Sequence, residues 1–484
     1  MRIFYRRSTL LVHAGSLKRL WLHLPIILAL TGCTEFMVKP TLDVALPKSW
    51  HTEMPRGDQP VPLSHTWWRQ IDDPVLVAVL EKIERDNLSI EQARFRLQAA
   101  RSDAGNTQYL PNINLSASLQ LDRNANGAGT QVNSSNSKTT GTYSAGSDVA
   151  WEIPLYGQYG TSQAIVAANT SYASADIQAV RAAVIAEAVQ RYSQLRANQK
   201  KRTLLNSIAI AQSRISALSE TKAKAGLIAY TGVARAAQDE QSVARELAAA
   251  EISLAESRQQ LARLCGLTEA PPEWEAPAEV PLFPHFVFND TPVDVIRNRP
   301  DIRKAEADVI VAAGKLDLAK ADRYPKLSLT GSVSQVGNVV AAPFSGGTVQ
   351  LSGMPVLTLP LFDWGSRLAK AKAQDARLAE KASLYREAVI VAINEVEQAL
   401  AAERAAAKQV SSATLSEKDA ARIGANITLL HSRGLVDDLE WQSSLVAHAR
   451  STIGHQDAKA NHASRIATLT KALGGGIATE QTRL

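Results

Sequence analysis

The residue types most often used for catalysis and metal binding are few in this chain and are not arranged for either task. Three of the nine histidines, His448, His455 and His462, lie seven residues apart on one predicted helix. A zinc site on a helix needs two histidines four residues apart, whereas a spacing of seven predicts a stripe along a packing seam or a solvent face. The sequence also contains no G-x-S-x-G, H-E-x-x-H, G-x-x-x-x-G-K-[ST] or G-x-G-x-x-G motif. We therefore predict no enzyme activity, no cofactor and no metal site.

One cysteine does have a chemical context. Cys33 follows Leu30-Thr31-Gly32, which ends an apolar stretch of about eleven residues behind a basic leader. That stretch is too short to span a bilayer. The order resembles the lipobox of bacterial lipoproteins, in which residues 1–32 are removed as a signal peptide and Cys33 carries lipid. Thr34, in place of Asp, resembles lipoproteins sorted to the outer membrane. The alternative is an ordinary signal peptide in which Cys33 is incidental.

Removal of this leader changes the charge balance of the chain. Residues 1–32 hold five of the 53 Lys and Arg and no acids, which leaves 48 bases against 47 acids. Binding to nucleic acid needs a surplus of positive charge gathered on one face, so the sequence predicts no nucleic-acid partner. The only other cysteine is Cys265. With Cys33 acylated, neither an internal disulfide nor a cysteine metal cluster can form.

Two halves of the chain carry the same landmarks in the same order. In each half a Pro precedes an alternating segment, an apolar-Pro-Leu-aromatic sequence follows a second one, and a Gly-Leu pair interrupts a long helical stretch. Gly434 lies 208 residues after Gly226, and Gly474 lies 208 residues after Gly266. Residues 268–292 between the halves contain six prolines, which predicts an extended crossover. We therefore predict an internal repeat.

Four alternating segments predict β-strands that have one apolar and one polar face. In the first, Ile113, Leu115 and Leu119 alternate with Asn and Ser, because successive strand side chains point to opposite faces. The predicted strands cover about 112–122, 142–154, 326–337 and 348–360. This is the length that a tilted transmembrane strand needs, although two half-buried hairpins of a soluble sheet would alternate in the same way. Four strands cannot close a membrane-spanning barrel in one chain, so spanning requires several chains.

Two helical stretches are too long for an ordinary globular domain. Residues 161–224 and 366–432 contain no proline, so at about 1.5 Å per residue each could extend roughly 95 to 100 Å. Shorter returning helices, at about 231–265 and 437–473, make each half a helical hairpin with unequal arms. A coiled-coil scaffold would account for these helices but not for the strands placed before them.

This order of elements resembles the TolC-like outer membrane factors, and the lipobox resembles their lipid-anchored NodT/OprM-type branch. Trp67-Trp68 followed by Asp73-Pro74, and Arg299-Pro300-Asp301-Ile302-Arg303, resemble the starts of the two halves in that family. The resemblance implies an α+β membrane protein that forms a homotrimer. Each protomer would give four strands to one twelve-stranded outer-membrane β-barrel, continued by a long α-helical periplasmic barrel.

The resemblance also implies a function and a place in the cell. The chain would be the outer membrane channel of a tripartite efflux system in a Gram-negative bacterium. It would be lipid-anchored in the outer membrane, with a tunnel across the periplasm. It would export drugs or toxic compounds, received from an inner-membrane efflux pump through a periplasmic adaptor (membrane fusion) protein. The lipoprotein branch favours a proton-driven pump over an ATP-driven one.

The predicted division of the chain follows from these landmarks. It comprises a signal peptide (1–32), an N-terminal anchor and equatorial segment (33–74), a first repeat (75–267), an equatorial crossover (268–292), a second repeat (293–474) and a C-terminal tail (475–484).

The two Gly-Leu turns are the predicted hairpin tips. They consist of Gly226 with Leu227 and Gly434 with Leu435. Glycine supplies the positive φ that such a turn needs, which is a structural requirement. In the family these turns also close the tunnel and contact the adaptor.

Acidic residues follow the second turn, where the family places a gate. Asp437, Asp438 and Glu440 are the candidate gate residues. Counting from Gly434 places one gate position of the family on Glu440, but the next falls on Ser443, where an Asp is more typical, so a second acidic ring is in doubt. The alternative for Asp437 and Asp438 is that they only cap the helix that begins there.

Two other functions fit part of the sequence. A lipid-anchored periplasmic scaffold or adaptor would use the hairpins for binding and would never form a pore, but it would not need a strand pair before each hairpin. The outer membrane component of a type I secretion system would share the whole architecture. The sequence does not specify the exported molecule.

Overall fold

A computed structural model of the protein describes residues 44–52, 61–62, 66–105, 110–124, 138–283, 286–287, 291–338 and 348–475. The predicted signal peptide and Cys33 lie outside the described residues, as does the predicted C-terminal tail after Gly475. The chain divides into two units. One consists of residues 106–166 and 310–379 together with residues 1–40, and the other contains the rest.

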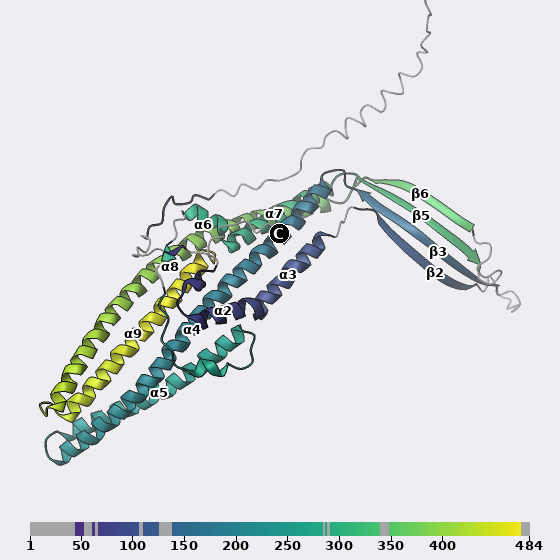
Figure 1. Cartoon of the computed structure of the whole chain (residues 1–484). Coiled ribbons are helices and arrows are strands. Elements are labelled where there is room, and N and C mark those ends of the chain that lie inside the picture. The colour runs from purple at the N-terminus through teal and green to yellow at the C-terminus, as the bar shows by residue number, and fades with distance from the viewer. Residues whose placement is uncertain are drawn as a thin grey trace, which may run out of the picture. The chain divides into compact units, whose positions relative to one another are not determined.

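The first unit holds an antiparallel four-stranded sheet in the order β2-β3-β5-β6 (Figure 1). The strands are β2 (Asn112–Asn124), β3 (Lys138–Ile153), β5 (Lys326–Asn338) and β6 (Thr348–Thr358). Each hairpin pairs two strands that are consecutive within one half of the chain, and the β3–β5 pairing joins the two halves. The strands overlap the four ranges predicted from alternation, and β3 begins four residues earlier than its predicted start at 142.

The helices fall in the same order on either side of these strands. Among the described residues, two α-helices precede each strand pair, and a long helix followed by a shorter one succeeds it. In the first half they are α2 (Pro74–Asp86), α3 (Leu88–Ala104), α4 (Gln158–Lys224) and α5 (Tyr230–Leu264). In the second half they are α6 (Pro292–Asn298), α7 (Pro300–Ala321), α8 (Ser366–Ser432) and α9 (Asp438–Ala472).

Helices α4 and α8 are the longest, with 67 residues each. Proline is absent from both, so nothing in their sequences removes a backbone donor or kinks the chain. Each runs beside its shorter partner, α4 with α5 and α8 with α9 (Figure 1). No helix in the described part of the chain combines the length and the apolarity needed to cross a membrane.

The main hydrophobic core lies in the second unit, where the short helices pack on the long ones. Trp67 and Trp68 are almost fully buried there and meet edge to face. Asp73 caps α2 by accepting from the backbone N–H groups of Val75 and Leu76, and its other oxygen accepts from the Tyr192 hydroxyl of α4 at 2.8 Å. The cap of α2 is thereby tied to α4, which fixes the start of the first half against that long helix.

The described residues of the crossover between the halves include a 3-10 turn, η2 (Pro272–Glu275), whose Trp274 is buried. A two-residue strand, β4 (Phe286–Val287), then pairs in parallel with β1 (Val61–Pro62) near the N-terminus. Residues near the N-terminus are also held by α8, because Glu397 accepts from the backbone N–H groups of His51 and Thr52.

Candidate functional site

The two faces of the sheet differ in chemistry along its whole length. On one face the paired positions are mainly apolar, as where Leu327 lies opposite Leu357 and Val333 opposite Leu351. Large apolar side chains on this face are exposed to between 41% and 88%, and they are Ile113, Leu115, Leu119, Leu329, Val333, Val349, Leu351 and Leu357. Exposed apolar side chains that form a continuous surface mark contact with a membrane or another protein.

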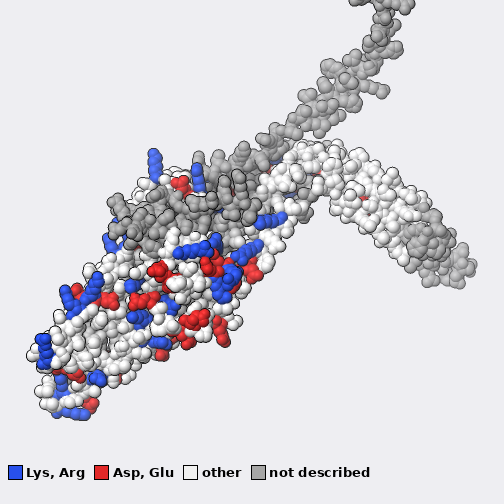
Figure 2. All heavy atoms as spheres, viewed as in Figure 1, with Lys and Arg blue, Asp and Glu red and all other residues white. Residues whose placement is uncertain are grey.

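The opposite face of the sheet is rich in hydroxyl groups. Ser118 and Ser144 share a hydrogen bond of 2.7 Å between β2 and β3, and Ser332 and Ser352 share one of 2.7 Å between β5 and β6. Thr330 donates to the backbone oxygen of Met354. Charged side chains are concentrated over the helices, and the part of the surface formed by the strands is almost entirely uncharged in the view of Figure 2. The sheet therefore combines one face suited to lipid with one suited to water.

The two Gly-Leu turns have the same backbone geometry. Gly226 has φ +74° and Gly434 has φ +70°. Gly226 donates to the oxygen of Ala223, and Leu227 donates to the oxygen of Lys222, both at 2.9 Å. The second turn repeats this pair of bonds with the oxygens of His431 and Leu430, so each long helix ends in a Schellman motif.

The apolar residue of each turn is left outside the helices. Leu227 is 72% exposed and Leu435 is 68% exposed. Each turn therefore presents a leucine on a rigid backbone, as a contact surface requires.

The structure places the candidate gate residues next to the second turn and gives each a different environment. Asp437 is the N-cap of α9, where it accepts from the backbone N–H of Glu440 at 2.9 Å. Its other carboxylate oxygen accepts from Nζ of Lys222, in the last turn of α4. The Lys222 ammonium, followed by the Glu440 N–H, lowers the pKa of the Asp437 carboxyl. The capping role considered from the sequence is thus present for Asp437, together with an ion pair between the two hairpins.

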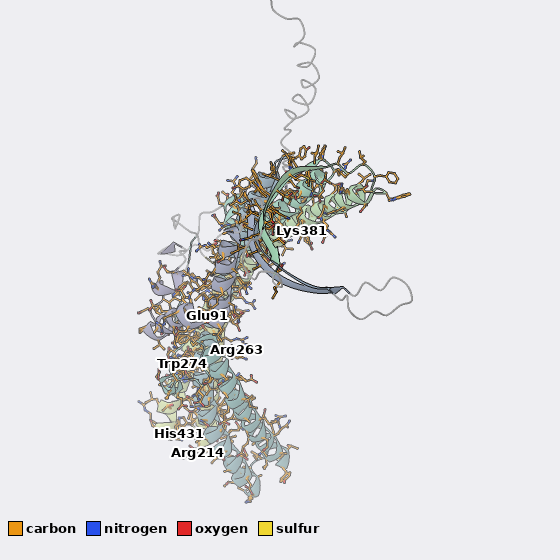
Figure 3. The ribbon with its side chains drawn as sticks, turned by 90° about the vertical axis from the view of Figure 1, so that its right-hand side faces the viewer. Glu91, Arg214, Arg263, Trp274, Lys381 and His431 are labelled. Carbon is orange, nitrogen blue, oxygen red and sulfur yellow. The ribbon has the colours of Figure 1, made fainter. Side chains whose placement is uncertain are left out.

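Asp438 does not cap the helix and instead contacts the end of α8. Its carboxylate lies 3.2 Å from Nε2 of His431. The His431 ring stacks on Trp441 with 4.5 Å between the ring centroids, and the Trp441 indole N–H donates to Thr428. Figure 3 shows His431 and Arg214 toward the same end of the helices. These contacts hold α8 and α9 together just before and after the turn.

Glu440 is the one candidate whose carboxylate is exposed and forms no ion pair or hydrogen bond within the described residues. Ser443, the next position of the counted pattern, is also exposed, and its hydroxyl donates to the backbone oxygen of Leu439. An exposed acid on a capped helix is free to face another molecule or another copy of the chain.

Sequence reasoning missed the partners of these acids. Lys222 and Asp437 are 215 residues apart, so no local pattern relates them. His431 and Trp441 lie on either side of the turn and were not singled out. For His431 and Asp438, which lie three residues before and four residues after Gly434, the useful signal was the hairpin itself, because a tight turn brings the residues on either side of it close together.

The histidine stripe lies on a packing seam between α8 and α9. His455 is 7% exposed, with Nδ1 next to Glu417 and Nε2 3.1 Å from the Thr414 hydroxyl. His462 lies 3.3 Å from Glu403, which is 4% exposed. Among the described residues no group of three or more His, Cys, Asp or Glu side chains is placed to hold a metal ion.

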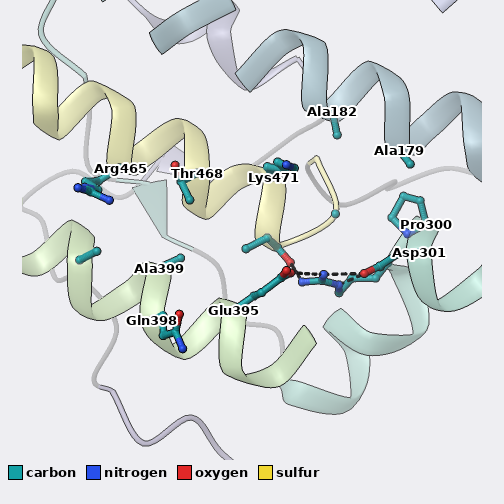
Figure 4. A pocket seen from close by; sticks show the side chains of 14 residues that line it. Ala179, Ala182, Pro300, Asp301, Glu395, Gln398, Ala399, Arg465, Thr468 and Lys471 are labelled. Carbon is teal, nitrogen blue, oxygen red and sulfur yellow. Dashed lines mark hydrogen bonds and ion pairs between the residues drawn. The ribbon is translucent and has the colours of Figure 1, made fainter. Parts of the chain in front are cut away.

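A cavity of about 500 Å³ lies between α4, α8, α9 and the start of α7 (Figure 4). Arg299, which is 5% exposed, crosses it and donates to Asp301 at 2.7 Å, to Glu395 at 2.6 Å and to the backbone oxygen of Ala472. Burial alone would lower the pKa of this guanidinium, but Asp301 and then Glu395 raise it above its usual value. Arg299 thereby holds the C-terminal end of α9 against α8.

An equivalent contact holds the end of α5. The side-chain amide of Asn87, at the start of α3, donates to the backbone oxygen of Leu264 at 2.8 Å. Leu264 is the last residue of α5 and Ala472 is the last residue of α9. In each half, the backbone oxygen at the end of the returning helix therefore accepts from a polar side chain. That side chain, Asn87 or Arg299, directly precedes the second short helix of the same half.

Comparison with known proteins identifies the family. Residues 79–267 and 291–475 match the family described as outer membrane efflux protein, so the chain belongs to this family. The nodulation protein T of Rhizobium leguminosarum bv. trifolii is 29% identical over 69% of this chain and 72% of its own length. The pyoverdine export outer membrane protein OpmQ of Pseudomonas putida is 25% identical over 80% of this chain and 82% of its own.

Solved structures show the same fold. The outer-membrane channel OprN has a TM-score of 0.73 at 23% identity, over 91% of this chain and 99% of that one. The CmeC outer membrane channel of Campylobacter jejuni has a TM-score of 0.75 at 20% identity, over 93% and 97%. The family resemblance and the outer-membrane efflux function predicted from the sequence are confirmed.

Proposed function

We propose that three copies of this chain form the outer membrane channel of a tripartite efflux system, with an internal repeat giving two strands and one long hairpin per half. The observation that carries the proposal is the sheet. Its exposed apolar face suits lipid, its hydroxyl face suits a water-filled lumen, and its edge strands β2 and β6 have no partner within the described sheet. Unpaired edges are not tolerated in lipid, so the sheet must close with strands from other copies.

The helices extend the channel on the periplasmic side. Each chain contributes α4 and α8, which at about 1.5 Å per residue are long enough to form a tunnel of roughly 100 Å. The turns at Gly226-Leu227 and Gly434-Leu435 are the proposed contacts with the periplasmic adaptor, supported by their rigid geometry and exposed leucines. Cys33 is the proposed site of lipid attachment, which would anchor the chain to the outer membrane.

The gate is the narrow end of this tunnel. We assign the inward-facing charge to Glu440, whose carboxylate is exposed and unpaired in the described structure, and we assign Asp437 and Asp438 to holding the turn in place. Three symmetry-related carboxylates would attract cations and repel one another.

The transported molecules are small organic compounds delivered by an inner-membrane pump, proton-driven in this lipoprotein branch. The relatives support this class of transported molecule but no single compound, because their names refer to pyoverdine export, fusaric acid resistance and solvent efflux. Selection among such molecules would take place upstream of the tunnel.

The proposal is tested with purified full-length protein. We expect an unheated sample to migrate as a trimer on a detergent gel, and we expect the same sample to form discrete channels in a planar lipid bilayer. A monomer that produces no conductance would instead support the periplasmic scaffold. Export is tested separately in the native bacterium, where deletion of the gene should increase sensitivity to toxic small molecules and the wild-type gene should restore resistance.

A further inference from the structure

The cavity beside Arg299 lies within one copy of the chain and is not used by the proposed channel. It holds about 500 Å³, and pockets that bind small molecules hold about 300 to 1,000 Å³. Its walls come from α4, α8, α9 and the start of α7, and all of its lining residues belong to the second unit. A molecule bound there would therefore contact helices from both halves of the chain.

Small residues leave this space open. The cavity is lined from α4 by Ala179 and Ala182, from α8 by Ala399 and Ala402, and from the end of α9 by Gly474. At these positions the helices face one another with a methyl group or with no side chain, so the space between them is not filled. Much of the cavity wall is therefore apolar, as it is in pockets for organic molecules.

The two acids of the cavity are already neutralised. Asp301 and Glu395 both accept from the guanidinium of Arg299, at 2.7 and 2.6 Å, and Arg299 is only 5% exposed. A cationic ligand would have to take a carboxylate from this buried guanidinium, and an uncompensated buried charge is costly. The cavity is therefore poorly suited to a cation.

The other two charges at the cavity are positive. Arg465 and Lys471 line it from α9, on either side of Thr468 (Figure 4). Neither cation forms an ion pair or a side-chain hydrogen bond within the part of the chain that the structure describes, and the same holds for the side-chain amide of Gln398 on α8. Thr468 adds no donor, because its hydroxyl already donates to the backbone oxygen of Ser464. Donors on two helices are thus available to an anion.

We propose that this cavity binds a small amphipathic organic anion. Its acidic group would accept from Arg465 or Lys471 of α9 and from Gln398 of α8, because hydrogen bonds between ions are the strong ones. Its apolar body would lie against the alanines of α4 and α8. Lys471 also lies in the last turn of α9, where a cation offsets the helix dipole. That structural role accounts for Lys471, but not for Arg465 or for the open space beside them.

Binding is measured by isothermal titration calorimetry on the purified full-length protein in detergent. The anionic probe is naphthoate, and naphthylmethanol is its uncharged counterpart of similar shape. A titration into detergent alone corrects for partitioning into micelles. We expect naphthoate to bind saturably at one site per chain and to raise the Tm, and we expect the alcohol to bind about tenfold more weakly. The affinity for naphthoate should fall as the salt concentration rises.

Two kinds of variant assign the binding to this cavity. Arg465→Ala and Lys471→Ala each remove one cation and should weaken naphthoate binding by about threefold to tenfold, whereas Lys471→Arg should retain it. Ala402→Leu keeps both charges and fills the space from α8 with another helix-forming residue, so it should abolish binding. Lys408→Ala is the matched control, because Lys408 is an exposed cation of α8 that does not line the cavity.

Equal binding of the two probes would show that apolar contact alone drives binding, and it would overturn the assignment to an anion. Naphthoate binding that survives Ala402→Leu, or that is unchanged in both alanine variants, would mean that the anion binds elsewhere on the protein. A lack of saturable naphthoate binding would overturn the proposal outright. None of these results bears on the proposed channel, which is tested by trimer migration and conductance.

Discussion

Lys222, in the last turn of α4, donates to the carboxylate of Asp437, which caps α9. The pair connects the ends of two hairpins that belong to different halves of the chain. Asp437 is held on its other side by the backbone N–H of Glu440, so its carboxylate cannot turn away without uncapping the helix. This ion pair fixes the distance between the two turns of one subunit, and it is exposed enough for another protein to compete for it.

Lys222→Ala should loosen the proposed gate of the tunnel. An exposed pair contributes about 0.2 to 1 kcal/mol, and in the proposed trimer the effect would act in each of the three copies. We expect a higher mean conductance in planar bilayers, with trimer stability unchanged. The control is Lys224→Ala, because Lys224 pairs with Glu220 within α4 and makes no contact between the hairpins.

The Lys222–Asp437 ion pair also predicts how the channel conductance depends on pH. Because the folded structure lowers the pKa of the Asp437 carboxyl, the contact is fully present above the usual carboxyl pKa and is lost as the pH falls through the lowered value. The conductance difference between Lys222→Ala and wild type should therefore be equal at pH 7 and pH 5.5 and should shrink only below about pH 4. A difference that already disappears at pH 5.5 would show that the Asp437 carboxylate does not carry this effect.

Removal of the Arg299 side chain should weaken the attachment of α9 to α8. Arg299→Ala leaves the backbone oxygen of Ala472 without its donor and separates Glu395 from its cation. We expect a loss of about 1 to 3 kcal/mol in the free energy of unfolding, seen as a lower Tm. Asn87→Ala removes the equivalent bond to Leu264 together with the N-cap of α3, where Asn87 accepts from the backbone N–H groups of Ser89 and Ile90, and should cost a similar amount. Arg303→Ala, which removes a mainly exposed contact with Gln178, is the control.

The long elements could be predicted from the sequence because their signals are local. Alternation specified β2, β3, β5 and β6, and the absence of proline specified the extent of α4 and α8. The prolines of the crossover exclude regular helix, but they do not show that Val61–Pro62 would pair with Phe286–Val287. That pairing depends on contacts between distant segments.

The candidate gate likewise combines features that a local pattern predicts with contacts that depend on tertiary packing. The cap at Asp437 could be read from its position before a helix, whereas its bond to Lys222 required the packing of two hairpins. His455 and His462 were placed on a face by their spacing, but nothing in that spacing showed that Glu417 and Glu403 would lie opposite on α8. Pairing between distant helices is set by tertiary packing, which a single sequence does not reveal.

The two faces of β2 should respond differently to the same substitution. Leu119→Arg places a cation on the apolar face, where it costs roughly 2 to 4 kcal/mol per copy near the middle of the bilayer. We expect loss of the heat-labile trimer. Ser118→Arg introduces the same side chain on the hydroxyl face and should leave assembly intact while shifting ion selectivity toward anions. If both variants assemble equally well, this strand does not face lipid.

The proposed anchor can be tested without disturbing the fold. Cys33→Ser should abolish incorporation of labelled fatty acid and leave the precursor uncleaved at residue 32, because the thiol is the only group there that can accept the lipid. Cys265→Ser is the matched control and should leave labelling unchanged. Labelling that persists in Cys33→Ser would exclude this cysteine as the attachment site.

Glu440 provides the sharpest test of the gate, because its carboxylate is exposed and unpaired while those of Asp437 and Asp438 are engaged within the subunit. In the proposed trimer, three inward-facing Glu440 carboxylates would form a multivalent site, so wild-type channels should be cation-selective and should be blocked by multivalent cations from the periplasmic side. Glu440→Gln keeps the shape of the side chain and removes its charge, and it should weaken both the selectivity and the block. Asp437→Asn should mainly raise conductance, through the lost contact with Lys222, and Asp438→Asn should act through the contact with His431. If Glu440→Gln keeps wild-type selectivity and block while Asp437→Asn loses them, the inward charge belongs to the residue that caps the helix, and Glu440 lies on the outer surface of the tunnel.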